Sequence, residues 1–174
     1  QLSYGSYDEL FENSEVAIVY IATPHNSHAE LSIRAMEYGK HVLCEKPVAI
    51  NHKEASKMVE VSKKTNRFFM EAFWTRFNPS VEQVLQQINN GIIGKIKYIN
   101  ADFAFKVDST GRTRMTAMEL AGGSLLDIGV YPLFLSYLIL GMPEEVLAVS
   151  NFFDTGADEQ TSIILQYKNA QAIL

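Results

Sequence analysis

Apolar and polar residues follow two different periods along the first half of the chain. A continuous apolar run with β-branched residues at Val16–Ala22 predicts a strand that is buried on both faces. Shorter apolar runs at His41–Cys44 and Arg67–Ala72 predict two further strands. Apolar residues at helical spacing separate these runs, beginning after Ser27 and after Asn51. Strands that alternate with helices in this order predict a parallel sheet with right-handed crossovers.

Capping signals set the expected ends of these helices. Ser6 and Glu9 have the spacing of a capping box, which predicts a short helix to about Asn13, and the two later helices begin with the same spacing. Gly39 is expected to end the second helix, because glycine adopts the left-handed conformation that closes helices. The third helix is expected to run to about Thr65.

The pattern changes after Trp74, where we place the boundary between two domains. Asn78–Pro79 predicts an N-cap followed by proline at the first helical position, and this helix is expected to reach Gly91. Alternation over Lys95–Phe105 predicts a half-solvated strand. The most apolar stretch predicts a largely buried helix over about Ser124–Leu140. The remaining segments are a loop at Asp108–Thr116, strands near Val146–Phe153 and Thr161–Tyr167, a turn at Lys168–Asn169 and the start of a strand at Ala170–Leu174.

Composition and charge exclude several classes of protein. The 174 residues are 47% hydrophobic and 20% charged, as in a globular protein rather than a disordered or fibrous one. A net charge of −5 disfavours nucleic-acid binding, which favours a basic face. Cys44 is the single cysteine, so it forms no internal disulfide and is expected to be a small core residue. No apolar run reaches the roughly 18 residues of a membrane-spanning helix, and no signal pattern opens the chain, so we expect a cytoplasmic protein.

Two polar loops follow predicted strands of the parallel sheet. Ala22–His28 comes directly after the first strand, and Glu45–Pro47 comes directly after the second. Each loop alone is read equally well as an ordinary turn, because proline and asparagine are common turn residues. Ligands of open parallel sheets bind at the carboxyl ends of the strands, so the two loops together predict a shared crevice.

Lys46 is the most informative residue of these loops. It lies between Glu45 and Pro47 directly after a buried strand, and the proline keeps its backbone out of the helical region. The backbone therefore aims its side chain, unlike that of a lysine on a solvated helix. A positioned ammonium group can lower the pKa of a neighbouring acid or polarise a hydroxyl.

Asp127 and Tyr131 lie four residues apart on the predicted apolar helix and therefore share a face. A buried carboxylate is costly without a partner, so Asp127 requires a cation or several hydrogen-bond donors. One interpretation is structural: Asp127 pairs locally and Tyr131 is a core aromatic residue. The other is catalytic: Tyr131 transfers a proton, and Lys46 lowers the pKa of its phenol.

Other polar and aromatic residues carry weaker signals. His25 and His28 lie three residues apart, but no further ligands occur at a spacing typical of zinc sites, so no metal is expected. At the domain junction, Trp74 and Phe77 are expected to pack between the domains, with Arg76 on the surface.

Three motifs together resemble one family. Ile21–Pro24 with His28, Gly39–Pro47 and Gly122–Tyr131 resemble the glucose–fructose oxidoreductase / inositol dehydrogenase (Gfo/Idh/MocA) family over nearly the whole chain. The last motif is specific, whereas Glu-Lys-Pro alone is not. Within the family the chain looks most like dihydrodiol dehydrogenases and related sugar dehydrogenases.

The resemblance implies a fold and an assembly. Residues 1–75 would be the C-terminal part of a dinucleotide-binding Rossmann domain of the α/β class, with a parallel sheet. Residues 76–174 would be part of an α+β domain with a mainly antiparallel open sheet that binds substrate. That sheet often forms the subunit interface, so a homo-oligomer is expected.

The resemblance also implies an activity, which is hydride transfer between NAD or NADP and a sugar, a cyclic polyol or a diol. Lys46, Asp127 and Tyr131 would be catalytic, with Tyr131 as the acid/base. Substrate would contact His25, Trp74 and Phe103. The cofactor would contact Ala22, Thr23, Pro24, His28, Glu45, Lys46, Trp74 and Arg76.

One departure from the family pattern leaves alternatives open. The glycine-rich turn Gly-x-Gly-x-x-Gly, which binds the pyrophosphate, does not occur in the sequence, so the chain is expected to start partway through the dinucleotide domain. A non-catalytic relative that senses a dinucleotide is one alternative, although such a relative needs no Lys46, Asp127 and Tyr131 together. Another is that this piece alone is inactive because it does not hold the cofactor.

Overall fold

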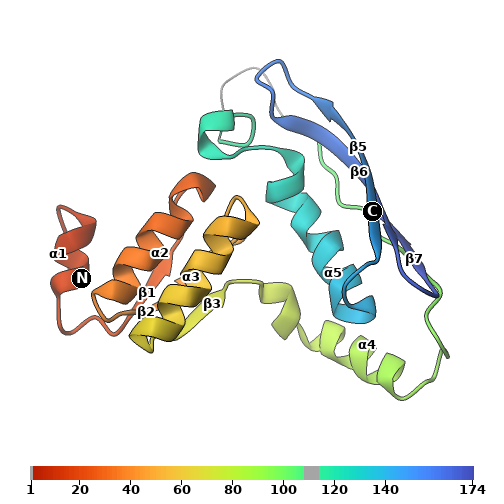
Figure 1. Cartoon of the computed structure of the whole chain (residues 1–174), viewed down its shortest axis with the longest axis horizontal. Coiled ribbons are helices and arrows are strands. Elements are labelled where there is room, and N and C mark those ends of the chain that lie inside the picture. Colours follow the sequence, from red (N-terminus) through yellow and green to blue (C-terminus); the bar gives the residue numbers. More distant parts are fainter. Residues whose placement is uncertain (1, 108–113) are drawn as a thin grey trace. The chain divides into compact units, whose positions relative to one another are not determined.

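The structure is a computed structural model that describes residues 2–107 and 114–174. It consists of two compact units, Gln1–Ala72 and Phe73–Leu174 (Figure 1). Trp74, near which the sequence pattern places the boundary, belongs to the second unit. Residues 108–113 of the predicted Asp108–Thr116 loop lie outside the described residues.

The first unit is a three-stranded parallel sheet in the order β1-β2-β3, as the alternating pattern predicts. The last residues of the three strands are partners in the sheet: Ile21 pairs with Cys44, and Cys44 pairs with Glu71. The three strands therefore end side by side. The elements are α1 (Tyr7–Glu12), β1 (Ile18–Ile21), a 3₁₀ turn (His25–Ser27), α2 (His28–Glu37), β2 (His41–Cys44), α3 (His52–Thr65) and β3 (Phe69–Glu71).

Two of the three helix caps predicted in the first unit are confirmed. The side chains of Ser6 and Asn51 each accept a hydrogen bond from the backbone N–H three residues further on. The predicted cap at Ser27 is wrong, because its side chain accepts no hydrogen bond from α2 and its hydroxyl donates to the Thr23 hydroxyl at 2.7 Å. Gly39 follows α2 with a φ of 81°, as its predicted role requires.

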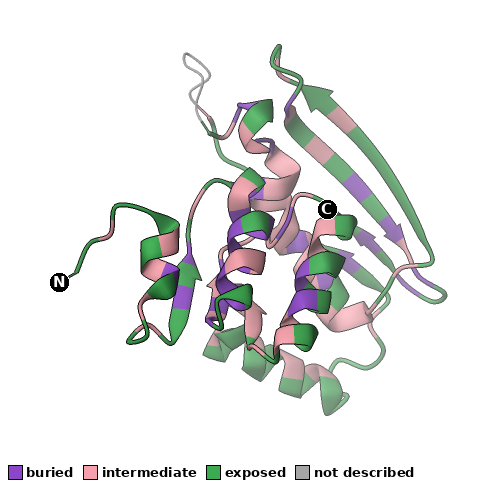
Figure 2. Cartoon of the chain, turned by 60° about the vertical axis from the view of Figure 1, so that its left-hand side comes forward, coloured by how far each residue is buried: buried purple, intermediate pink, exposed green. Residues whose placement is uncertain are grey.

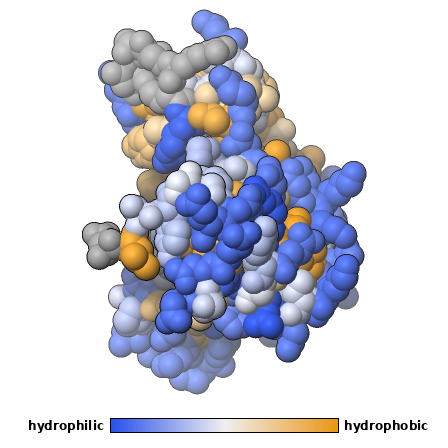
Figure 3. Space-filling view, turned by 90° about the vertical axis from the view of Figure 1, so that its left-hand side faces the viewer, coloured by the Kyte–Doolittle hydropathy of each residue, from blue (hydrophilic) through white to orange (hydrophobic). Residues whose placement is uncertain are grey.

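The core of the first unit lies on one side of its sheet. Alternate residues of β1 and β2 pack against α2 and α3 in a single apolar cluster (Figure 2). On the other side, Ile18 and Tyr20 are 54% and 55% exposed, so the predicted burial of this strand on both faces is wrong. The reason is that α2 and α3 both cover the same face of the sheet. The outer surface of this unit is mainly hydrophilic (Figure 3).

The second unit contains a four-stranded mixed sheet in the order β4-β7-β6-β5, in which β4 and β7 are parallel and the other neighbours are antiparallel. Its elements are a 3₁₀ turn (Trp74–Phe77), α4 (Pro79–Asn89), β4 (Tyr98–Asn100), a 3₁₀ turn (Met118–Leu120), a π-helical turn (Leu125–Gly129), α5 (Val130–Leu140), β5 (Glu145–Phe152), β6 (Asp158–Gln166) and β7 (Gln171–Ile173).

The predicted strand Lys95–Phe105 is much shorter in the structure. Only Tyr98–Asn100 is assigned to β4, and these residues pair with the three residues of β7. A strand extends as far as its partner does, so Phe103 and Phe105 lie beyond the ladder. The cap at Asn78 is confirmed, since its side chain accepts a hydrogen bond from the Ser80 N–H.

The apolar helix predicted over Ser124–Leu140 begins with a π-helical turn before it becomes α-helical. Leu125, Leu133 and Leu140 pack against the buried apolar cluster of the sheet. Most other side chains of this stretch are half-buried, and Tyr137 is exposed. The buried positions in it are Asp127, Pro132 and Ser136.

By length and composition alone, the helical stretch Met118–Leu140 is long and apolar enough to cross a membrane, and it is the one such stretch among the described residues. The criterion of an uninterrupted apolar run missed it, because Glu119 and Asp127 interrupt the run. Its packing on the sheet cluster is that of a core helix.

Candidate active site

Two loops lie at the carboxyl ends of paired strands in the first unit. Residues 22–28 follow β1 and residues 45–48 follow β2, and the last residues of the two strands are partners in the sheet. The loops therefore emerge side by side, where open parallel sheets bind ligands.

His28 joins the two loops. Its side chain is fully buried, with Nδ1 2.8 Å from the Pro47 carbonyl oxygen and Nε2 2.8 Å from the Thr23 carbonyl oxygen. Each ring nitrogen thus lies within hydrogen-bond distance of a backbone carbonyl, one in each loop. The ring of His25, also buried, meets that of His28 edge-on at 5.7 Å. Both nitrogens of His28 are thus engaged inside the protein.

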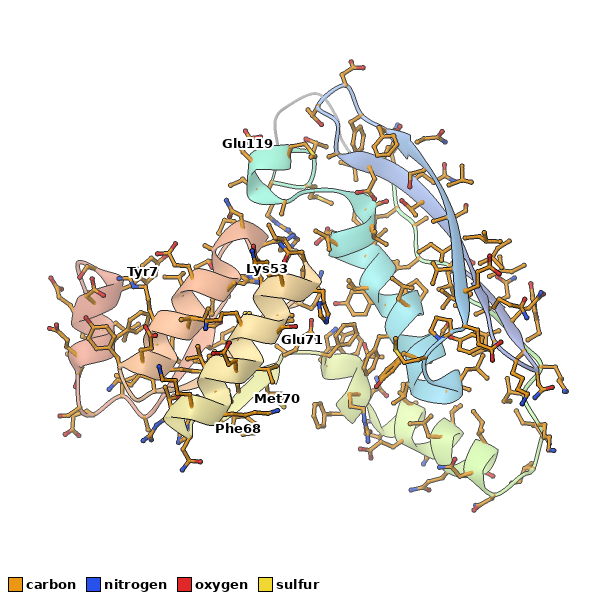
Figure 4. All side chains as sticks on the ribbon, viewed as in Figure 1. Tyr7, Lys53, Phe68, Met70, Glu71 and Glu119 are labelled. Carbon is orange, nitrogen blue, oxygen red and sulfur yellow. The ribbon has the colours of Figure 1, made fainter. Side chains whose placement is uncertain are left out.

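Glu71 holds the second loop through a hydrogen bond to the loop backbone. It closes β3 (Figure 4), and its Oε1 accepts a hydrogen bond from the Val48 N–H at 2.8 Å. Burial raises the pKa of the Glu71 carboxyl, while the Val48 N–H and nearby His28 act in the opposite direction. Sequence reasoning missed this residue, although a charged side chain at the end of an apolar strand was the available signal.

Glu45 folds back onto its own loop. It accepts hydrogen bonds from the Tyr20 hydroxyl and, at 3.1 Å, from the Lys46 N–H. The hydrogen bond to the carboxylate raises the pKa of the Tyr20 phenol. The Lys46–Pro47 peptide bond is cis. The Glu45 carboxylate thus holds the Lys46 N–H, and hydrogen bonds to His28 and Glu71 hold the Pro47 carbonyl and the Val48 N–H that follow.

Tyr131 lies in an aromatic cluster of the second unit, formed with Phe73, Trp74 and Phe103. Its ring centroid is 5.3 Å from Phe73, 6.4 Å from Trp74 and 5.6 Å from Phe103. The Trp74 Nε1 donates a hydrogen bond to the Tyr131 hydroxyl at 3.3 Å. Trp74 is 61% exposed and Phe103 48% exposed. The structure thus brings together three residues that the sequence assigns to the site.

Asp127 precedes Tyr131 by four residues and is buried. Arg114 Nη1 donates to its Oδ1 at 3.4 Å, which supplies the cation that a buried carboxylate requires. Sequence reasoning did not single out Arg114, because nothing local marks which arginine of a polar loop turns toward a helix.

The other predicted residues are placed as follows. Arg76 is exposed in the 3₁₀ turn that follows Phe73. Cys44 is a buried core residue, as predicted, and burial raises the pKa of its thiol to about 12. No group of three or more His, Cys, Asp or Glu side chains that would hold a metal ion occurs within residues 2–107 and 114–174.

Family models match both units of the chain. Residues 2–73 match the oxidoreductase family with an NAD-binding Rossmann fold, and residues 81–174 match the Gfo/Idh/MocA C-terminal domain. The chain belongs to the Gfo/Idh/MocA oxidoreductase family. The resemblance and the fold class expected from the motifs are thereby confirmed.

Curated relatives are dehydrogenases of diols and sugars. The chain is 37% identical over 175 residues to trans-1,2-dihydrobenzene-1,2-diol dehydrogenase of Xenopus tropicalis, covering 99% of this chain and 52% of the relative. It is 40% identical over 187 residues to D-xylose 1-dehydrogenase (NADP(+)) of Hypocrea jecorina, covering 98% of this chain and 48% of the relative. The chain spans about half the length of these relatives.

A solved structure has the same fold. The 3-ketoreductase KijD10 of Actinomadura kijaniata, in complex with NADP and TDP-benzene, superposes with a TM-score of 0.89 at 32% identity. The match covers 97% of this chain and 53% of KijD10.

The residues of the first unit fit part of a dinucleotide site. They offer two adjacent loops at the carboxyl edge of a parallel sheet, fixed to each other through His28, with the cationic Lys46 in one of them. The glycine-rich turn that cradles the pyrophosphate in Rossmann folds does not occur in these 174 residues.

Proposed function

We propose that the whole protein carrying this chain is an NAD(P)-dependent oxidoreductase that acts on a CH–OH group of a sugar, a cyclic polyol or a diol. The observation that carries the proposal is the placement of Tyr131, four residues after the buried Asp127 and in contact with the exposed rings of Trp74 and Phe103. Family membership and the activities named for the relatives support it.

Tyr131 is the proposed acid/base. When bound, the nicotinamide supplies the acceptor or donor of the hydride. The Tyr131 side chain, as its phenolate, takes the proton from the substrate hydroxyl during oxidation, and as the phenol it returns that proton to the substrate oxygen during reduction. Asp127, which is held by Arg114, accepts a hydrogen bond from a second substrate hydroxyl. Lys46 is the third proposed catalytic residue, and its ammonium group contributes a positive charge.

The aromatic cluster supports a ring-shaped substrate. Trp74 and Phe103 both precede Tyr131 in the sequence, and their exposed rings lie within ring-contact distance of it. Aromatic faces pack well against the apolar face of a sugar ring or a cyclic diol, whose hydroxyls then point to the acid/base. Phe73 packs behind Tyr131 and is itself stacked on Phe134 at 4.2 Å.

The assembly is proposed to be a homo-oligomer formed through the sheet of the second unit. Strand β5 lies at the edge of that sheet and exposes Val146, Leu147, Val149 and Phe152. Exposed apolar residues clustered on a sheet are typical of protein interfaces. Sedimentation of the whole protein tests this proposal: a lysine at position 149 (Val149→Lys) is expected to shift the species toward monomer.

Turnover assays of the whole protein test the proposed activity. Sugars, cyclic polyols and cyclic diols are each supplied with NAD or NADP, and reduced nicotinamide is followed by absorbance. Turnover with at least one ring-shaped diol or sugar is expected. Dinucleotide binding without any turnover, measured by quenching of Trp74 fluorescence, would instead favour the non-catalytic dinucleotide sensor.

A further inference from the structure

Asp158, the first residue of β6, reaches the start of the helical stretch that carries Asp127 and Tyr131. Its Oδ2 accepts a hydrogen bond from the Ser124 hydroxyl at 2.7 Å and from the Leu125 N–H at 2.6 Å. Asp158 lies 33 residues after Leu125 in the sequence, so this contact joins two distant segments of the second unit.

The contact replaces an ordinary helix cap. The first N–H groups of a helix have no partner within the helix, and a side chain at the N-cap usually supplies one. Ser124 occupies that position, but its side chain makes no cap hydrogen bond and donates to Asp158 instead. A carboxylate at this end also interacts favourably with the helix dipole. Asp158 therefore caps the helix from a neighbouring strand.

Neighbouring hydroxyls hold the Asp158 carboxylate in place. Thr161, three residues along β6, donates to its Oδ2 at 3.2 Å. The Thr161 hydroxyl lies 2.8 Å from that of Ser150 on β5, which completes a chain of hydrogen bonds across the two strands. The carboxylate is thus fixed relative to the sheet, and the helix start is fixed relative to the carboxylate.

Gly123 makes room for this arrangement. A Cβ at this position would lie 2.0 Å from Oδ1 of Asp158, and the backbone has a φ of 128°, which side chains rarely adopt. The Gly123 N–H donates to the Met115 carbonyl at 2.8 Å, and its carbonyl accepts from the Asp127 N–H at 3.1 Å. The glycine therefore links the Asp158 contact directly to the backbone of Asp127.

The helical stretch that carries Asp127 and Tyr131 begins with a π-helical turn, Leu125–Gly129. Leu125 opens the π turn, and its carbonyl accepts from the Val130 N–H, five residues on. Isolated π turns are rare and commonly lie at functional sites. Rewinding this turn to α-helix would change the register between Asp127 and Tyr131, which lie on either side of its end. An anchor on the Leu125 N–H opposes that change.

We propose that Asp158 is a positioning residue that holds the π-helical turn in register and thereby sets where the side chains of Asp127 and Tyr131 lie. The catalytic consequence rests on the proposed function, whereas the placement does not. The two are therefore tested by separate readouts.

Fluorescence of Trp74 tests whether Asp158 sets the position of the Tyr131 side chain. Trp74 is the only tryptophan of the sequence, and its indole donates to the Tyr131 hydroxyl. Tyr131→Phe removes that acceptor and defines the emission change that loss of the contact produces. Asp158→Ala, with circular dichroism to confirm folding, is expected to change Trp74 emission in the same direction. Asp158→Asn, which keeps the size and one acceptor oxygen, is expected to give a smaller change.

Asp154→Ala is the matched control, because Asp154 is an exposed acid in the turn before β6. It is expected to leave the emission unchanged. Folded Asp158→Ala and Asp158→Asn variants with wild-type emission would overturn the proposal.

Steady-state kinetics of the whole protein test the effect of Asp158 on catalysis. Asp158→Asn is expected to lower kcat by roughly ten- to a hundredfold, because small misplacements of catalytic groups are costly, with the KM for the dinucleotide unchanged. A wild-type kcat would overturn the positioning role. If the wild-type protein turns over no substrate while the emission changes as expected, the placement stands and the proposed activity fails.

A double-mutant cycle gives a second, structural readout. Gly123→Ala forces the Asp158 carboxylate away, so Asp158→Ala is expected to cost less unfolding free energy in that background than in the wild type. Additive losses would contradict a direct coupling between the two residues.

Discussion

The indole nitrogen of Trp74 donates a hydrogen bond to the hydroxyl oxygen of Tyr131 at 3.3 Å. Indole N–H groups only donate, so the Tyr131 oxygen is the acceptor in this contact. The contact joins an exposed ring, which is available to a substrate, to the proposed acid/base. Under the proposed function, this pair of residues links substrate binding to proton transfer.

Trp74→Phe is expected to retain a ring for the substrate and to remove the donor. A single hydrogen bond is worth about 0.5–1.5 kcal/mol, so kcat is expected to fall about two- to tenfold with a smaller change in the KM for substrate. Trp74→Ala is expected to raise that KM as well. Steady-state kinetics of the whole protein measure both effects, and equal kinetic constants for Trp74→Phe and wild type would refute the link.

Glu71→Gln is expected to alter the pH dependence of stability. The pKa of Glu71 is raised by burial in the folded state, so the folded chain binds this proton more tightly than the unfolded chain does. Its contribution to stability is therefore present at low pH and is lost as pH rises above about 4.3, the usual glutamate pKa, and through the raised folded value. Glutamine removes this loss and retains an acceptor for the Val48 N–H.

Urea unfolding at a series of acidic to neutral pH values measures that effect. The difference in unfolding free energy between Glu71→Gln and wild type should grow in favour of the variant as pH rises. Glu82→Gln, on the exposed side of α4, is the matched control and should not reproduce the trend. A pH-independent difference for Glu71→Gln would show that the carboxyl does not titrate differently in the folded state.

Cys44 is expected to resist thiol reagents in the native protein. Its side chain is fully buried, and burial raises its pKa to about 12, so little reactive thiolate exists near neutral pH. Labelling with an aromatic disulfide should proceed only as the first unit opens, and it should accelerate with denaturant. Native labelling at the rate of the unfolded chain would contradict the buried placement of the thiol.

Local sequence signals predicted the elements of the first unit well. The caps at Ser6 and Asn51, the left-handed Gly39 and the strand His41–Cys44 depend on residues within a few positions of one another. The parallel order of the sheet followed from their alternation with helices. The exposed face of β1 was not predictable in the same way, because it depends on which side both helices cover.

Non-local contacts account for what sequence reasoning missed. The length of β4 depends on the three residues of β7, which lie far along the chain. Glu71 and Asp158 act through backbone groups of distant segments, and no motif marks such pairs. The fold brings Tyr131, Trp74 and Phe103, which the family resemblance assigned to the site, into one cluster.

The most direct test of the account is the rate of the chemical step in Tyr131→Phe. In single-turnover experiments on the whole protein, this variant is expected to lose about 10²–10⁴ in rate, as removal of an acid/base does, with dinucleotide affinity unchanged. Tyr137→Phe, an exposed tyrosine on the same helix, serves as the control and should match wild type. A Tyr131→Phe rate close to that of wild type would contradict the central claim that Tyr131 carries the proton.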